Sequence, residues 1–201
     1  MSTDELREQL RILSSDYEAV AAFRPITSET LNRGEALHRE IVLLERKIRQ
    51  IEGLQYLSPI DGWKLKWTKS DTKVHLHSTQ LRSCLICPCY LSHPSNSLIA
   101  RIEFRTTLRS AMVFIDYDEL EKHPLYHCGL EGLGAYHVVN SQWKKNTKIE
   151  HQIDCSRCFH YLFCFNSCLA EVLAGSFQTE IVEGDLSEVL RSVLCEGFLG
   201  K

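Results

Sequence analysis

The spacing of the hydrophobic residues in this chain changes between residues 51 and 63. Up to Ile51 the apolar side chains recur every three or four positions, which is typical of a helix that packs along a narrow stripe. From Trp63 onward they alternate with polar residues, which is typical of a strand with one buried face. We therefore predict a helical, coiled-coil segment over residues 1–54 and an α+β globular domain over residues 55–201.

The first segment carries the signals of two helices. Ser2 and Glu5 have the spacing of a capping box, and Pro25 separates the first helix from a second one capped by Thr27 or Ser28. The second helix has an apolar seam of period 3.5, which predicts a coiled-coil interface with a partner helix or a second copy. The seam consists of Leu37, Ile41, Leu44, Ile48 and Ile51. The alternative is a hairpin in which the two helices pack on each other and on the domain.

The second segment begins with strand signals. Residues 63–67 and 74–77 alternate between apolar and polar side chains, and their short connection at Ser70-Asp71 predicts an antiparallel hairpin. Residues 100–105 and 111–117 predict two further strands. The apolar stretch from Ser83 to Leu91 contains Pro88, which predicts an edge strand or a bulge.

Helical signals return toward the end of the chain. The apolar residues from Ile149 to about Gly175 predict a long central helix, followed by a short strand from Phe177 to Val182. Asp185 and Glu188 then predict the start of a last helix. Strands grouped ahead of helices favour one antiparallel sheet with helices packed on one face.

The charge and hydropathy of the chain restrict the partners and the compartment that we expect for it. It has a formal net charge of −3 and a pI near 6.3, and we predict no direct contact with nucleic acid. The densest basic stretch, residues 143–148, is interpreted as a solvated loop, with a phosphate-binding patch as the alternative. The chain has no long apolar run and its first residues are polar, so we expect a nuclear or cytoplasmic protein that is neither membrane-bound nor secreted.

All nine cysteines lie between Cys84 and Cys195. In a reducing compartment they stay free, and most are expected to be small buried hydrophobes. Two C-x-x-C pairs nevertheless have the spacing of zinc knuckles, so a zinc site is the alternative to a chain without a cofactor. The candidate ligands are Cys84, Cys87, Cys155 and Cys158.

A short motif resembles an element of the ubiquitin-conjugating enzymes. His93-Pro-Ser-Asn96 is similar to their His-Pro-Asn element, but with one residue inserted. In that family a nucleophilic cysteine follows within a short stretch, whereas the next cysteine here is Cys128. The spacing therefore predicts no catalytic residue, and a conjugation enzyme remains an alternative only.

The order of the predicted elements resembles the RWD-type subunits of kinetochores. In these proteins a short N-terminal coil pairs subunits, and a small sheet-and-helix domain docks partners. The chain lacks the Tyr-Pro-x-x-Pro-Pro turn that many RWD domains carry, so the resemblance rests on architecture. It implies a non-enzymatic subunit of a nuclear or chromosomal assembly that contacts other subunits through the coil and the domain; the alternatives are a zinc-binding module and an E2-like conjugation protein.

Overall fold

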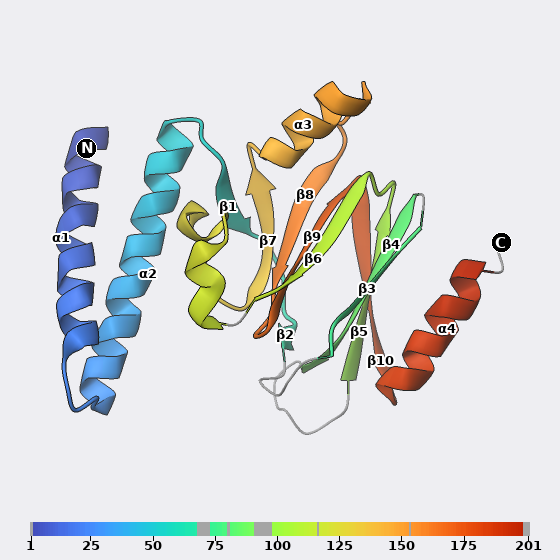
Figure 1. Cartoon of the computed structure of the whole chain (residues 1–201), viewed down its shortest axis with the longest axis horizontal. Coiled ribbons are helices and arrows are strands. Elements are labelled where there is room, and N and C mark those ends of the chain that lie inside the picture. Colours follow the sequence, from blue (N-terminus) through green and yellow to red (C-terminus); the bar gives the residue numbers. More distant parts are fainter. Residues whose placement is uncertain are drawn as a thin grey trace. The chain divides into compact units, whose positions relative to one another are not determined.

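The computed structural model describes residues 2–67, 73–79, 81–90, 98–115, 117–152 and 154–198. It shows an α+β protein in which two helices precede antiparallel sheets and later helices (Figure 1). The chain divides into two compact units. One contains the residues up to Leu57 together with Glu121–Glu131, and the other contains Ser58–Leu120 and the residues from Gly132 onward.

The first unit is built on a hairpin of two antiparallel helices, α1 (Thr3–Ala22) and α2 (Ser28–Ile51). Three contacts fix their direction, because they pair the start of α1 with the end of α2 and the end of α1 with the start of α2. Arg7 forms an ion pair with Glu52, the rings of Tyr17 and His38 lie 5.9 Å apart, and Val20 approaches Gly34. The predicted capping box of Ser2 with Glu5 is present at the start of α1, and α2 is capped by Thr27, where Thr30 completes a second capping box.

A short irregular segment completes this unit on a second face of α2. It contains part of the 3₁₀ helix η1 (Tyr117–Lys122) and the 3₁₀ helix η2 (Tyr126–Cys128). Arg46 of α2 donates a hydrogen bond from Nε to the carbonyl oxygen of Gly129 over 2.8 Å and forms an ion pair with Glu131. The backbone of Gly129 has a φ of +94°, and a Cβ there would meet the Arg46 side chain at 2.1 Å.

Two five-stranded sheets account for most of the second unit, although strand β1 begins in the first unit (Figure 1). The first sheet has the order β1-β7-β8-β9-β6, with bounds Tyr56–Pro59, Gly134–Val139, Phe159–Cys164, Cys168–Ala174 and Arg109–Phe114. The second has the order β10-β5-β4-β2, with β3 also paired to β4, and bounds Ser176–Glu183, Leu98–Arg105, Arg82–Tyr90, Lys66–Trp67 and His75–Ser78.

The main core lies between the two sheets. Alternate residues of β4 and β5, such as Leu85 and Ile102, pack with alternate residues of β8 and β9, such as Phe163 and Val172. Aromatic rings fill its centre: Phe104 and Phe163 are almost completely buried, with ring centroids 5.7 Å apart in an edge-to-face arrangement.

The two later helices are associated with different sheets. In α4 (Leu186–Phe198), Val189 and Val193 pack on Cys84, Ile86 and Ile99, which point away from the main core. Helix α3 (Gln142–His151) lies against β8, the central strand of the other sheet. The expected single sheet with helices on one face is therefore replaced by two packed sheets with a helix on each. Among the described helices, none combines the length and apolar character needed to cross a bilayer.

Several predicted elements differ from the structure. Residues 149–175 do not form a central helix, because β8 and β9 follow the end of α3. The strands predicted at 63–67 and 74–77 appear as β2 and β3, but both pair with β4 and not with each other. Their predicted turn at Ser70-Asp71 lies outside the described residues.

The Pro88 strand is also central, not at an edge. β4 pairs with β5 along one side and with both β3 and β2 along the other. β3 covers Ser83–Ile86 and β2 covers Cys89–Tyr90, so Pro88 lies in the gap between these partners, where the ladder needs no N–H donor on that side.

Candidate functional site

The predicted coiled-coil seam is used inside the chain, at least in part. Ile48 is buried, Leu37, Ile41 and Leu44 are half-buried, and Ile51 is exposed. Because α1 runs antiparallel to α2 and buries Leu6 completely, the seam packs within the hairpin. This arrangement matches the alternative in which the two helices pack on each other.

Large apolar side chains remain exposed where α1 connects to α2. Phe23, Ile26 and Leu31 have exposed fractions of 55%, 65% and 56%. We call these three residues the hairpin tip. Clustered apolar side chains on a surface are a common feature of protein interaction sites.

The structure does not bring the four candidate zinc ligands together. Cys84 packs beside α4, whereas Cys87 points from the same strand into the main core. This follows from their spacing, because residues three apart on a strand face opposite sides. Cys155 and Cys158 belong to a third cluster, with Leu173. Within the described residues, no three His, Cys, Asp or Glu side chains are arranged to hold a metal ion.

The motif that resembles the ubiquitin-conjugating enzymes, His93-Pro-Ser-Asn96, lies outside the described residues, but the next cysteine after it, Cys128, is described. Cys128 lies in η2 and is buried, and burial raises the pKa of its thiol. Burial likewise raises the pKa of Cys158. A raised thiol pKa disfavours the thiolate, which is the nucleophilic form.

Ser141, His160 and Glu171 form a buried polar group in the second unit. Ser141 follows β7 and caps α3, His160 lies on β8 and Glu171 on β9. In the pairing of β8 with β9, His160 is opposite Leu173 and Glu171 is opposite Leu162. Because these positions are two residues apart on one face, the imidazole and the carboxylate meet diagonally across the two strands.

The distances within this group are short. Ser141 Oγ lies 2.7 Å from His160 Nδ1, and His160 Nε2 lies 3.0 Å from Glu171 Oε2. The second contact is close but not aligned as a straight hydrogen bond. A carboxylate beside Nε2 favours the tautomer with the proton on that nitrogen, so that Nδ1 accepts a hydrogen bond from the serine hydroxyl. All three residues are buried.

Neighbouring groups hold the imidazole in place. The indole of Trp143 stacks on the His160 ring with a centroid distance of 4.7 Å and an angle of 4° between the planes. The guanidinium carbon of Arg109 lies 4.3 Å from the centre of the Trp143 ring. Ser141 Oγ also accepts a hydrogen bond from the backbone N–H of Lys144, which fixes the hydroxyl at the start of α3.

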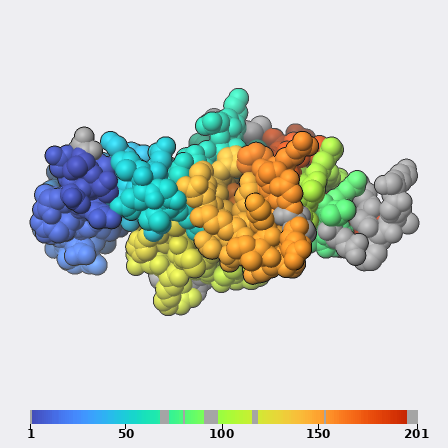
Figure 2. Space-filling view, turned by 90° about the horizontal axis from the view of Figure 1, so that it is seen from above, coloured from blue at the N-terminus to red at the C-terminus, as the bar shows by residue number. Residues whose placement is uncertain are grey.

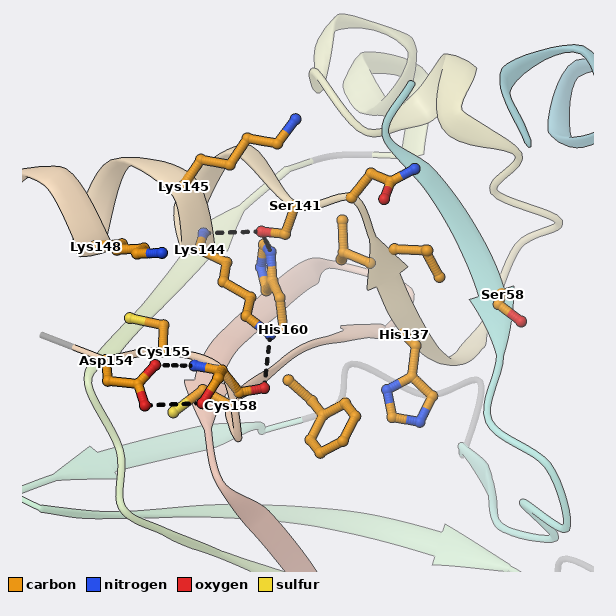
Figure 3. Close-up of a pocket in the computed structure, with 15 residues that line it drawn as sticks. Ser58, His137, Ser141, Lys144, Lys145, Lys148, Asp154, Cys155, Cys158 and His160 are labelled. Carbon is orange, nitrogen blue, oxygen red and sulfur yellow. Dashed lines mark hydrogen bonds between the residues drawn. The ribbon is translucent and has the colours of Figure 1, made fainter. Parts of the chain in front are cut away.

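A pocket of about 590 Å³ opens at this group (Figure 3). Its lining includes Ser141 and His160 together with three lysines of α3, and its volume falls in the usual range for small-molecule sites. Lys144, Lys145 and Lys148 make its wall basic, although Lys144 also donates to the carbonyl oxygen of Ser156 over 3.3 Å. In the space-filling view, α3 and its neighbours form the surface coloured orange (Figure 2).

No family model, curated protein or solved structure matches this chain. Its function is therefore inferred from the geometry of the two units.

Sequence reasoning missed the Ser141 group. The basic stretch at residues 143–148 forms α3, not a loop. The available signal was local: Asn140 and Ser141 are both residues that favour turns and helix starts, and they follow an alternating stretch from Tyr136. Asn140 takes a left-handed φ of 54°, and Ser141 then begins the helix. Nothing in the local sequence connects Ser141 to positions 19 and 30 residues later.

Proposed function

We propose that this chain is a subunit of a protein assembly and docks a helix of another subunit on its hairpin tip. The observation that supports this is the exposure of Phe23, Ile26 and Leu31 in a hairpin whose own seam is partly covered. Burying these side chains in a partner would remove apolar surface from water at about 25 cal/mol per Å².

The occupant is a different subunit and not a second copy of the chain. A stable homodimer buries roughly 1,200–2,000 Å² in total, which three side chains on each copy do not supply. A partner that contributes its own apolar groove or helix can make the tip the anchor of a larger contact. The role does not require catalysis. We extend the proposal to a nuclear, kinetochore-like assembly on the basis of the resemblance to RWD-type subunits, and to further docking on the globular domain.

The proposal revises how the coil is used. A partner helix that replaced α1 along the seam would have to expose Leu6, which is completely buried. The double substitution Ile41→Asp with Ile48→Asp would therefore disrupt the hairpin itself, and any lost binding would be ambiguous. Substitutions at the tip avoid this difficulty because their side chains are already exposed.

A crosslinking experiment tests the proposal. A photoreactive phenylalanine analogue is placed at Phe23, and in a second variant at Gln9, an exposed polar position on α1. We expect a crosslink to one defined protein from position 23 only. The purified partner should then lose at least tenfold in affinity, measured by calorimetry, when Phe23→Ser and Ile26→Ser are combined and the circular dichroism spectrum is retained. Unchanged affinity in that variant would overturn the proposal.

A further inference from the structure

We infer that the pocket around Ser141 is an acyl-ester hydrolase site, with Ser141 as nucleophile and His160 as general base. The substrate class is an ester or thioester that carries a negative charge. This inference is independent of docking at the hairpin tip, and either can fail without the other.

The geometry contains the parts that nucleophilic catalysis by serine needs. A serine hydroxyl is a weak nucleophile unless a neighbouring base accepts its proton. The 2.7 Å contact with His160 Nδ1 supplies that base, and the carboxylate of Glu171 lies 3.0 Å from the other ring nitrogen. Glu171 does not reach the pocket and is a positioning residue, because it acts on the imidazole only. The three roles match those of serine hydrolases, here with the ring nitrogens exchanged.

The surroundings of the serine favour the same chemistry. Ser141 and His160 both line the pocket, so the proposed reaction would take place at its wall (Figure 3). Ser141 stands at the start of α3, a ten-residue helix whose dipole favours negative charge that develops at this end. The stack of Trp143 on the imidazole covers one ring face and limits its rotation.

The reaction balances with water as the only co-reactant. Ser141 Oγ attacks the acyl carbon, and its proton passes to His160 Nδ1. The tetrahedral intermediate then expels the alkoxide or thiolate, which takes that proton from His160 and leaves as an alcohol or thiol. Water attacks the acyl-serine and gives its proton to the same nitrogen. The acyl–Oγ bond breaks, Oγ regains the proton, and the carboxylic acid leaves.

The pocket wall indicates the charge of the substrate. Lys144, Lys145 and Lys148 all line the pocket, and the acidic Asp154 accepts hydrogen bonds from the backbone N–H and the hydroxyl of Ser156. The three lysines outnumber the one acidic side chain of the lining, so the pocket favours a substrate anion. Cys158 also lines the pocket, but burial raises the pKa of its thiol, which disfavours the nucleophilic thiolate.

Covalent labelling of the full chain tests the nucleophile without any substitution. The protein is incubated with a fluorophosphonate, which modifies activated serines, and the adduct is located by mass spectrometry. We expect modification of Ser141. A chain that remains unmodified after prolonged exposure, or that is modified elsewhere only, overturns the inference.

Hydrolysis of two chromogenic esters then tests the reaction and its charge preference. The probes are 3-acetoxy-4-nitrobenzoate, which is anionic, and 2-nitrophenyl acetate, which is neutral. We expect at least a tenfold higher kcat/KM for the anionic ester and a loss of at least 100-fold in Ser141→Ala. Ser2→Ala is the matched control, because Ser2 is also a helix-capping serine and lies in the other unit. Equal rates in Ser141→Ala and the unsubstituted chain would overturn the inference.

The role of Glu171 has its own readout. In Glu171→Gln the imidazole loses the carboxylate beside it, so kcat for the anionic ester, counted per fluorophosphonate-reactive site, should fall at least tenfold while KM stays within twofold. A residue that only supported the fold would lower the number of reactive sites and leave the kcat of each site unchanged. An unchanged kcat removes Glu171 from the proposed site.

Discussion

The hydroxyl oxygen of Ser141 contacts His160 Nδ1 at 2.7 Å and the backbone N–H of Lys144 at 3.1 Å. One side chain therefore connects the central strand of a sheet to the first turn of the helix that lies against it. The Ser141 hydroxyl therefore contributes both to the stability of the second unit and to the proposed site, because the group that would react also anchors α3.

Ser141→Ala should destabilise the second unit more than the loss of an ordinary helix cap. The cap contributes about 1 kcal/mol, and a buried imidazole nitrogen left without its partner costs a further ~1–3 kcal/mol. The free energy of unfolding can be measured by urea titration with tryptophan fluorescence, because Trp63, Trp67 and Trp143 all lie in the second unit. In Ser2→Ala the same signal should stay unchanged. A loss below about 1 kcal/mol for Ser141→Ala would show that His160 finds another partner.

Local signals made the helical part of the fold predictable. Both caps of the hairpin depend on residues three positions apart, such as Ser2 with Glu5, and α4 begins just after Asp185 as expected. These contacts form within one helical turn, so the sequence contains the whole pattern. The spacing of seam residues such as Ile41 and Ile48 is the same whether the seam of α2 packs against α1 or against a partner helix. Which of the two it packs against depends on the fold of the full hairpin, so the sequence pattern alone could not decide it.

The β8–β9 region was not predictable for a different reason. Every residue of β9 is buried, including Glu171, so the strand shows no alternation and its apolar residues look like those of a buried helix. The same misreading concealed the site. With residues 149–175 interpreted as one helix, His160 and Glu171 could not be placed diagonally across two strands.

Stability should rise with pH in the range just below neutrality because of His137. Burial lowers the pKa of this imidazole below its ordinary value of 6.5, although Asp61 acts in the opposite direction. Between the two pKa values the unfolded chain binds the proton and the folded chain does not, so acidification favours unfolding. Urea titrations between pH 5 and 7.5 should show this slope, and His137→Gln should flatten it. An equal slope in both proteins would assign the effect to another group.

One thiol of nine should react quickly in the folded protein. Cys195 is exposed, whereas the other eight cysteines are buried. Burial also raises the pKa of Cys89 and Cys168 to about 11 and that of Cys164 to about 12, which leaves little thiolate at pH 8. A disulfide reagent such as Ellman's reagent should therefore release one equivalent rapidly and eight more after denaturation. Cys195→Ser should remove the rapid phase. A second rapid thiol that maps to Cys155 or Cys158 would indicate that the pocket opens in solution.

The hairpin should depend on side chains that α1 buries and not on those that it exposes. Leu6 is completely buried, and a Leu→Ala change at such a site costs about 2–5 kcal/mol because it removes apolar contact and leaves a cavity. Ile12 on the same helix is 49% exposed, so Ile12→Ala should cost less than about 1 kcal/mol.

The hairpin contains no tryptophan, so hydrogen exchange of the α1 and α2 amides is the suitable measurement. We expect faster exchange across both helices in Leu6→Ala and nearly unchanged exchange in Ile12→Ala. If the two variants behave alike, α1 is not packed against α2 in solution, and the seam of α2 becomes available to a partner helix.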